Sequence, residues 1–252
     1  MAPLELRIVA LPLEGEIQEG ADLAGLVLAA AADAGEALRD EDVLLVTQKA
    51  VSKAEGRLVR LADVEPSALA RQFAADYDKD PSHVEVVLRE SRRIVKMDRG
   101  VLVTETHHGF VCANAGVDAS NVAGGGTVSL LPVDSDRSAT ELREALRSAA
   151  GVAPAVIITD TFGRVWRNGL TNVAIGVAGM APLQSFAGQQ DLFGYELRVT
   201  VMAVADELAG AAELVMGKTD GVPFALVRGF PYETRDGTAR ELVRDAALDL
   251  FR

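Results

Sequence analysis

The sequence predicts an α+β fold in which mixed sheets pack against helices. Short apolar runs rich in β-branched residues, typical of buried strands, recur along the chain. Segments with helix-capping residues follow some of these runs but not others, so the chain lacks the strict strand–helix alternation of a doubly wound sheet. No repeat or low-complexity linker divides the 252 residues, and we expect a single domain over residues 1–252, with room for two subdomains.

The first hundred residues contain two predicted strands and three predicted helices. The strands are expected over residues 4–11 and 42–47, and the helices over residues 23–34 and 66–77 and from residue 80 onward. Asp22 is a capping residue and Gly35 a helix-ending one, which places the first helix between them. Asp80 followed by Pro81 marks the start of the third helix, because proline is favoured in a first helical turn.

The middle of the chain predicts a hairpin, a further strand and a helix. Strands are expected over residues 101–105, 110–114 and 127–132. The first two flank His107 and His108, and because successive strand residues point to opposite faces, we expect these histidines at the surface and not on one metal ion. Ser138 and Glu141 have the spacing of a capping box, and Gly151 is expected to end the helix that they open.

The last hundred residues predict three strands and two helices. The strands are expected over residues 155–159, 171–177 and 224–227, and the helices over residues 198–216 and 239–251. Gly217, Lys218 and Thr219 look like the end of a P-loop, but Ala212 stands where that motif needs its first glycine, and a predicted helix precedes the glycine instead of following it. We therefore interpret Gly217 as a helix end, or as part of a nucleotide or metal loop of another kind.

The composition argues against one class of function and against internal disulfides. The formal net charge is −12, so no basic face is available for general nucleic-acid binding. An anionic ligand would need cations supplied locally, by clustered arginines or by bound metal. The single cysteine, Cys112, cannot form an internal disulfide and is expected to pack as a small hydrophobe.

We expect a cytoplasmic protein that does not enter a membrane. The longest apolar run, residues 23–32, is far shorter than the roughly 18 residues of a membrane span. Glu5 and Arg7 interrupt the first apolar stretch, which therefore does not look like a signal peptide.

Polar side chains follow the predicted strand at residues 155–159. Asp160 and Thr161 come first, and a carboxylate beside a hydroxyl at a strand end can bind a hard cation. Arg164 and Arg167 follow, and both can bind phosphate or carboxylate. The alternative is a polar turn in which Asp160 accepts from a backbone amide.

Two other polar segments have the same two interpretations. Gln48, Lys53 and Arg57 follow the strand at residues 42–47 and either bind an anion or form a solvated loop. Asp118 and Asn121 lie in a glycine-rich segment that either approaches a ligand closely or is an ordinary loop. Carboxylate and hydroxyl oxygens without histidine or thiolate suit Mg²⁺ or Mn²⁺, and such ions bridge phosphate oxygens. The combination suggests phosphoryl chemistry with a nucleoside triphosphate and leaves the acceptor open.

Five segments, in this order, resemble the coenzyme F420:L-glutamate ligase family: LPLEGEIQEGADL, VTQKAVSKAEGR, NAGVDASN, ITDTFGRVWRNG and AAELVMGKTDGVPFALVRG. The resemblance covers about residues 8–230. It implies an unusual α+β fold that forms an intertwined homodimer. It also implies a GTP-dependent ligase that adds L-glutamate to the deazaflavin precursor F420-0 through an acyl phosphate and then extends the product with γ-linked glutamates. The implied cofactors are Mg²⁺ or Mn²⁺, at two sites, and K⁺.

The resemblance also implies residue roles. Asp118 and Asp160 are implied as ligands of one metal ion and Thr161 as a ligand of a second, with Asp118, Asp160 and Arg164 as catalytic residues. The implied GTP contacts are Glu14, Gly15, Glu16, Ile17, Gln48, Lys53, Asn121, Met216, Gly217, Lys218, Thr219, Asp220, Gly221, Val222 and Pro223. Some relatives have an oxygen-bearing side chain in place of Lys218, and a protonated lysine cannot bind metal. Either a backbone carbonyl or water substitutes there, or Lys218 contacts phosphate.

Three alternatives stay open. They are a metal-dependent nucleotide hydrolase, a ligase for another carboxylate, and a non-enzymatic acidic module whose glycine-rich loops only join strands. Some relatives carry a nitroreductase-like domain after the ligase; because this chain ends at Arg252, we expect neither that domain nor tightly bound flavin mononucleotide.

Overall fold

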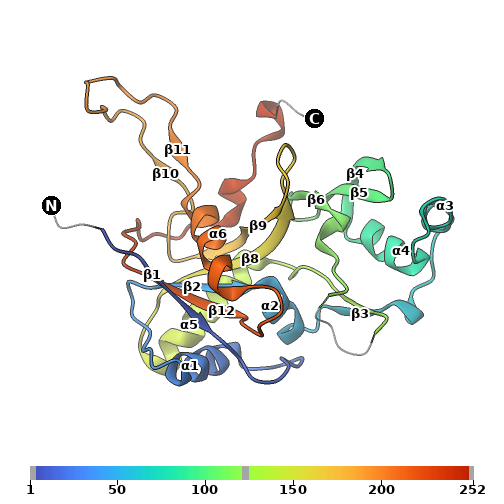
Figure 1. Cartoon of the computed structure of the whole chain (residues 1–252), viewed down its shortest axis with the longest axis horizontal. Helices are drawn as coiled ribbons and strands as arrows, with labels where there is room; N and C mark the ends of the chain where they lie inside the picture. The colour runs from blue at the N-terminus through green and yellow to red at the C-terminus, as the bar shows by residue number, and fades with distance from the viewer. Residues whose placement is uncertain (1–3, 121–124, 250–252) are drawn as a thin grey trace.

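The computed structural model describes residues 4–120 and 125–249, and within them it confirms the α+β class (Figure 1). The central sheet has the strand order β1-β12-β2-β8-β9. Its strands are β1 (Arg7–Leu11), β12 (Phe224–Arg228), β2 (Val43–Thr47), β8 (Ala155–Gly163) and β9 (Leu170–Ala178). β2 and β8 are parallel, whereas the other neighbouring strands of this sheet are antiparallel. All five coincide with predicted strands, although β1 begins three residues later and β8 runs four residues further than expected.

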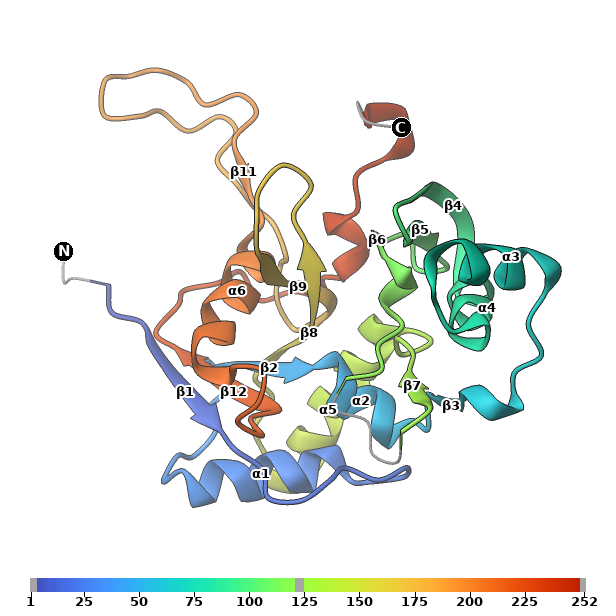
Figure 2. The ribbon, with the colours of Figure 1, turned by 45° about the vertical axis from the view of Figure 1, so that its right-hand side comes forward.

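Helices cover both faces of this sheet (Figure 2). The helices α1 (Leu23–Asp33) and α5 (Ser135–Ala150) pack on one face, and α6 (Val204–Met216) and the short turn η3 (Ala239–Leu242) pack on the other. Leu44 and Val46 of β2 point into the first core, and Val43 and Leu45 point into the second. Burial on both faces explains why these strands read as uninterrupted apolar runs.

The segment between β2 and α5 builds a separate hydrophobic core beside the central sheet (Figure 1). The segment begins with α2 (Gln48–Ala54), whose buried Ala50 and Val51 belong to the first core of the central sheet. Its other elements are β3 (Leu58–Arg60), η1 (Leu61–Asp63), α3 (Ala68–Tyr77), α4 (Pro81–Arg89), β4 (Ser91–Asp98), β5 (Val101–Thr106), β6 (Val111–Ala113), η2 (Asn114–Gly116) and β7 (Thr127–Ser129). Phe73 and Val84 from the helices meet Leu102 and Val128 from the strands in this core. The β5–β6 hairpin and the helix start at Asp80 are confirmed, and Cys112 is buried as predicted.

Two predictions about helix starts are wrong for identifiable reasons. The Ser138–Glu141 pair does not open α5, because Asp134 lies one turn earlier and accepts from the Arg137 amide at 3.1 Å. The predicted helix over residues 198–216 begins at Val204, after the short strand β11 (Val201–Met202), which pairs with β10 (Gln184–Ser185). These two strands form the base of an arm that projects from the molecule (Figure 1).

Two further segments differ from their predictions. Residues 48–54 form the helix α2 and not a loop, with the Thr47 hydroxyl accepting from the Ala50 amide. The predicted helix over residues 239–251 is replaced, within the described residues, by the turns η3 and η4 (Ala246–Leu248). The backbone returns to an extended conformation at Val243, so no continuous helix forms. Among the helices of residues 4–120 and 125–249, none combines the length and the apolar character that a membrane crossing requires.

Three acidic side chains close the outer edge of β9. Each accepts a backbone amide of this edge strand at 2.8 Å, in the pairs Asn172 with Glu213, Ala174 with Asp206, and Val177 with Asp136. Unpaired edge amides would otherwise invite pairing with another chain. At Gly176 a Cβ atom would lie 2.3 Å from the Ser135 carbonyl oxygen, so glycine is required for the start of α5 to pack this closely on β9.

A buried ion cluster ties the last strand to the central sheet. Arg228 at the end of β12 donates from Nε and Nη2 to the Asp42 carboxylate at 2.7 and 2.8 Å and from Nη1 to Glu36 at 2.9 Å. The Asp42 side chain is fully buried. The hydrogen bonds that Arg228 donates to Asp42 raise the pKa of Arg228 further above its ordinary value.

Replacing Arg228 should destabilise the fold strongly. Arg228→Met leaves the buried Asp42 carboxylate without its partner, and we expect the free energy of unfolding to fall by about 3–5 kcal/mol. Arg71→Met, which removes an exposed pair with Glu65, should cost about 0–1 kcal/mol and serves as the control. Urea unfolding measures both, and equal losses for the two variants would refute the anchoring role of Arg228.

Candidate active site

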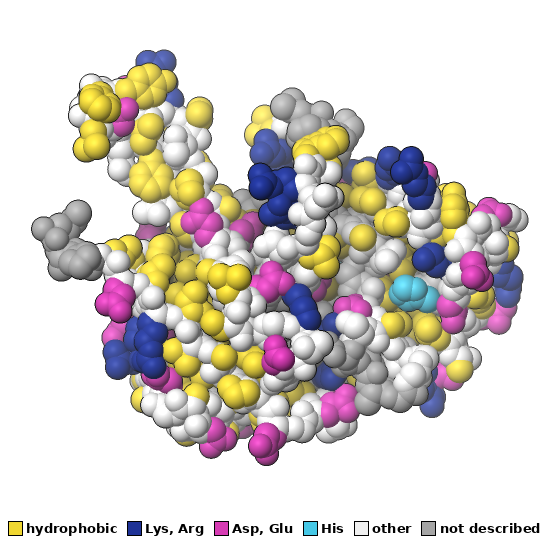
Figure 3. Space-filling model, viewed as in Figure 1, with side chains coloured by type: hydrophobic (Ala, Val, Ile, Leu, Met, Phe, Trp, Pro, Cys, Tyr) yellow, Lys and Arg dark blue, Asp and Glu magenta, His cyan; other side chains and the backbone are white. Residues whose placement is uncertain are grey.

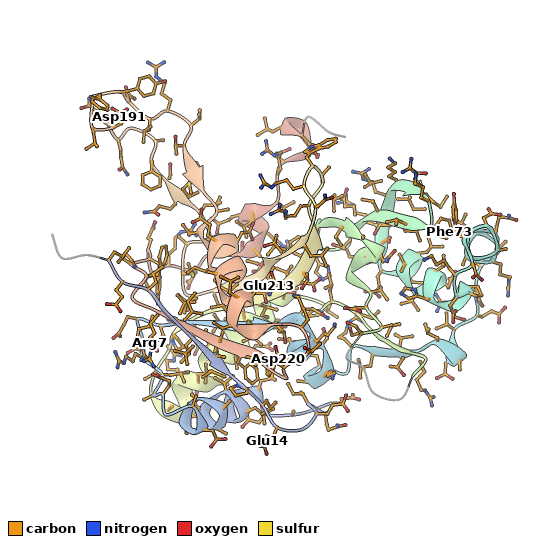
Figure 4. The ribbon with its side chains drawn as sticks, viewed as in Figure 1. Arg7, Glu14, Phe73, Asp191, Glu213 and Asp220 are labelled. Atoms are coloured by element: carbon orange, nitrogen blue, oxygen red, sulfur yellow. The ribbon has the colours of Figure 1, made fainter. Side chains whose placement is uncertain are left out.

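A cavity of about 550 Å³ lies at the edge of the central sheet where β2 and β8 end. Five segments line it: the loop after β1, the start of α2, the residue Asp118, the polar ends of β8 and β9, and the loop joining α6 to β12. In Figure 4, the labelled residues Glu14, Glu213 and Asp220 mark three of the elements around it. Because β2 and β8 are parallel, their carboxyl ends share one sheet edge, which is where α/β sheets usually bind ligands.

The cavity collects most of the residues predicted for the site. Those that line it are Gly15, Glu16, Ile17, Gln48, Lys53, Asp118, Asp160, Thr161, Met216, Gly217, Lys218, Thr219, Gly221, Val222 and Pro223. Glu14 and Asp220 lie on lining loops without lining the cavity themselves. Arg164 lies in the turn between β8 and β9, where basic side chains gather (Figure 3), and Asn121 falls outside the described residues.

The two aspartates lie in the same cavity but in different electrostatic surroundings. Burial raises the pKa of Asp160 to about 6, and the nearby charge of Asp118 adds to this rise. Burial also acts upward on the pKa of Asp118, but hydrogen bonds from Lys49 and Ser120 outweigh it and lower that pKa below its ordinary value. Among the described residues, Asp160 forms no salt bridge, although the charges of Lys49 and Lys218 act on it and partly offset the effect of burial on its pKa.

Lys49 forms a salt bridge with Asp118, and the sequence did not indicate this pairing. Its ammonium lies 2.7 Å from the Asp118 carboxylate and 2.6 Å from the Ser120 hydroxyl. The backbone of Asp118 pairs with Ser129 at the end of β7, which fixes the carboxylate against the first turn of α2. The missed helix α2 is thus the element that brings Lys49 to this aspartate.

A second group of polar side chains surrounds Thr161. Its hydroxyl donates to Asn172 Oδ1 at 2.8 Å, across the β8–β9 pair in which the two residues are in register. Lys218 donates to the Thr161 hydroxyl at 2.7 Å and to Asn172 Oδ1 at 3.2 Å, and it pairs with Glu213 at 2.5 Å. Asn172 is buried inside a predicted apolar strand, and a buried amide there was the available sign that this strand borders a site.

Gln48 and Lys53 also face the cavity from α2. Gln48 is buried and donates to the Leu130 carbonyl and the Ser52 hydroxyl at 2.7 Å each, which fixes α2 against the chain after β7. Lys53 pairs with Glu16 at 3.0 Å and so connects α2 to the loop after β1. The Lys53–Glu16 pair therefore connects two walls of the cavity, and Gln48 fixes the position of one of them.

The donor set fits a hard divalent cation at Asp118 and Asp160. Around these aspartates the cavity offers carboxylate, hydroxyl and amide oxygens, which are ligands that Mg²⁺ and Mn²⁺ prefer over nitrogen or sulfur. Among the described residues, no group of three or more His, Cys, Asp or Glu side chains is placed to hold a metal ion. His107 and His108 instead contact the carbonyls of Arg89 and Pro132, at 2.9 and 2.8 Å. Two carboxylates supplemented by ligand oxygens are the usual arrangement for Mg²⁺.

The loop after α6 is not a P-loop. Gly217 ends α6, with its amide donating to the Glu213 carbonyl at 3.0 Å and its φ at 60°, so the helix precedes the glycine as predicted. Residues 216–223 then pass along the cavity, and the Gly221 carbonyl accepts from the Leu13 amide at 3.0 Å. This contact joins the two loops that border the cavity on the β1–β12 side.

Comparison with known proteins identifies the family. Residues 14–229 match the model of the family described as F420-0:Gamma-glutamyl ligase. The chain belongs to the F420-0:gamma-glutamyl ligase family. The match includes every residue that lines the cavity except Leu13. Membership establishes that the chain is a ligase, which removes the non-enzymatic alternative.

Relatives of the family are similar over nearly the whole chain. A coenzyme F420:L-glutamate ligase of Methanothermobacter thermautotrophicus is 45% identical over 245 residues, which is 96% of each chain. One of Methanopyrus kandleri is 47% identical over 252 residues, covering 98% of each. One of Methanocaldococcus jannaschii is 40% identical over 216 residues, covering 85% of this chain and 86% of the relative.

The two aspartates should affect stability in opposite directions. In chelator-treated protein, Asp160→Asn should raise the free energy of unfolding at about pH 7.5, because a raised pKa means that folding disfavours the ionised carboxylate. This gain should shrink as the pH falls from about 6 toward 3.8, where the unfolded carboxyl also becomes protonated. Asp118→Asn should instead lower the free energy of unfolding at about pH 7.5. The lowered pKa of Asp118 means that folding favours the ionised carboxylate, and this stabilisation is fully present at pH values above the ordinary pKa of aspartate.

Urea unfolding of both variants and the wild type, at about pH 7.5 and about pH 4, measures these differences. Shifts of the same sign in the two variants at about pH 7.5 would contradict the contrast between the aspartates.

Proposed function

We propose that this chain is a GTP-dependent ligase that joins L-glutamate to coenzyme F420-0 and then extends the product through γ-linked glutamates. The observation that carries the proposal is the cavity in which Asp118, Asp160 and Thr161 lie beside Lys49, Lys53 and Lys218. Family membership and the names of relatives that are 40–47% identical support the substrates.

The cavity has the properties that a triphosphate site requires. Its volume of about 550 Å³ is in the usual range of small-molecule sites. Three lysines line it together with Glu16, Asp118 and Asp160, so a protein of net charge −12 still presents fixed cations at this edge of the sheet. We assign the GTP to the walls formed by residues 15–17, 48–53 and 216–223.

The aspartates are proposed to hold Mg²⁺ or Mn²⁺. When bound, such an ion neutralises phosphate charge and polarises the γ-phosphate for transfer to the F420-0 carboxylate. Asp160 is suited to this role because its carboxylate is buried, close to Asp118 and without a salt bridge among the described residues. Lys49 keeps Asp118 ionised and oriented toward the cavity.

Arg164 is proposed to bind the acceptor. It lies in the turn that rises from the Asp160 and Thr161 end of β8, and Arg167 lies in the same turn. Guanidinium groups there suit the phosphodiester and carboxylates of F420-0 and the incoming glutamate. We also propose K⁺ as an activator, on the basis of the family resemblance.

One incubation separates the proposal from its alternatives. The protein is incubated with GTP, Mn²⁺, L-glutamate and F420-0, and the products are identified by mass spectrometry. Glutamate adducts of F420-0 formed with GTP and not with ATP are the expected result. Loss of GTP without adducts indicates a nucleotide hydrolase, and adducts that form only when another carboxylic acid replaces F420-0 indicate a different ligase.

Removing the Asp160 charge should abolish ligation without unfolding the protein. Asp160→Asn keeps the size of the side chain but loses its charge, and we expect the rate of glutamate addition to fall by about 10²-fold or more. Asp63→Asn, at an exposed aspartate outside the cavity, should leave the rate unchanged. Wild-type turnover in Asp160→Asn would show that the metal role of Asp160 is wrong.

We also propose that the chain forms a homodimer through its projecting arm. The arm, residues 183–203, is a hairpin whose tip exposes Leu192 and Phe193 almost completely, at 99% and 95%. Hydrophobic side chains gather at the end of the arm in Figure 3. A two-stranded ribbon is marginally stable alone in water, and exposed apolar side chains of this size mark interaction surfaces. A second copy of the chain is the proposed partner, in line with the intertwined dimer that the family resemblance implies.

The arm can be tested through the mass of the protein in solution. Sedimentation equilibrium should give twice the chain mass of 26.6 kDa for the wild type and one chain mass after joint replacement of Leu192 and Phe193 by aspartate. Leu69→Asp, at an exposed position on α3, should keep the dimer. A wild type that sediments as a single chain would refute the proposal.

A further inference from the structure

Lys218 occupies the centre of a cation site made of protein oxygens. Its Nζ lies 2.7 Å from the Thr161 hydroxyl, 3.2 Å from Asn172 Oδ1 and 2.5 Å from Glu213 Oε1. These oxygens come from β8, β9 and α6, and they converge from three elements on one point at the cavity wall. An ammonium has three N–H donors, so Lys218 can donate to all three of these oxygens.

The oxygens around Lys218 are already neutralised by its charge. Glu213 supplies the single carboxylate of this group, and Lys218 pairs with it directly. Thr161 and Asn172 are neutral ligands. A divalent cation bound to the Thr161 hydroxyl would share that oxygen with a fixed positive charge, and the two like charges would repel each other at short range.

The charge balance at Asp118 and Asp160 differs from that around Lys218. Lys49 neutralises Asp118, but Asp160 forms no salt bridge among the residues that the structure describes. One carboxylate charge therefore remains to attract a divalent cation at that position. The donor sets thus fit a metal ion at Asp118 and Asp160 and do not fit a second one at Thr161.

We infer that the Lys218 ammonium takes the place of a second divalent ion, so that this chain holds one divalent ion per cavity. The inference rests on the proposed function for the first ion at Asp118 and Asp160. Lys218 then supplies a permanent positive charge on the Thr161 side of the cavity, where it can meet a phosphate oxygen. That part of the phosphate binding does not depend on the concentration of metal.

Counting bound Mn²⁺ tests this inference without measuring activity. Equilibrium dialysis against Mn²⁺ alone, with no nucleotide, is compared for the wild type, Lys218→Gln and Lys218→Arg. Asp160→Asn gives the background of weak binding to surface carboxylates, which is subtracted. Lys218 is half exposed, so both variants should fold, and thermal unfolding checks this.

The expected counts above background are one Mn²⁺ per chain for the wild type and two for Lys218→Gln. In that variant the amide oxygen of the introduced side chain and the released Glu213 carboxylate join Thr161 and Asn172 as oxygen ligands. Lys218→Arg keeps the positive charge and should stay at one. Two ions in the wild type, or one in Lys218→Gln, would overturn the inference while leaving the proposed function standing. No binding above background in any variant would overturn both.

Discussion

The parallel pairing of β2 with β8 determines where the chemistry of this protein can occur. The pairing joins Val43–Thr47 to Ala155–Thr159 residue by residue, so the chain leaves this pairing at the same edge of the sheet in both strands. β2 continues directly into α2, with its lysines, and β8 itself continues through Asp160 and Thr161. Cationic and anionic side chains from distant parts of the sequence therefore meet without any long loop having to carry them there.

The electrostatics of the cavity follow from placing both kinds of charge together. A chain with 37 acidic and 25 basic residues is poorly suited to anionic ligands unless its lysines are concentrated. Lys49, Lys53 and Lys218 each pair with a carboxylate of the site or of its walls. Each ion pair fixes a cation that would otherwise move freely in solvent, and Asp160 remains as the carboxylate without such a pair among the described residues.

The sequence predicted the elements that leave a local pattern. The five strands of the central sheet appear as apolar runs, and the starts of α1 and α4 are marked by their capping residues. It did not predict α2, whose polar residues face a ligand cavity, or β4, an exposed strand held by pairing with β5. The formation of α2 and β4 depends on contacts between residues far apart in the sequence, and local sequence patterns do not reveal such contacts.

The sequence predicted the site residues that lie in recognisable segments, but not those whose role depends on contact with a distant residue. Asp118, Asp160 and Thr161 were identified from their segments, and the structure brings them to one cavity. Lys49 and Asn172 were missed as site residues, since their importance lies in contacts with Asp118 and Thr161 that no local spacing reveals. The pairing of Lys218 with Glu213 belongs to the same class.

Glu213 links the integrity of the sheet to the charge in the cavity. One of its carboxylate oxygens accepts the Asn172 amide at the edge of β9, and the other binds Lys218. Replacing Glu213 would therefore remove the acceptor of the Asn172 amide and the partner of Lys218 in a single step. Replacing Lys218 would instead change the charge in the cavity while leaving the Asn172 amide bound to Glu213.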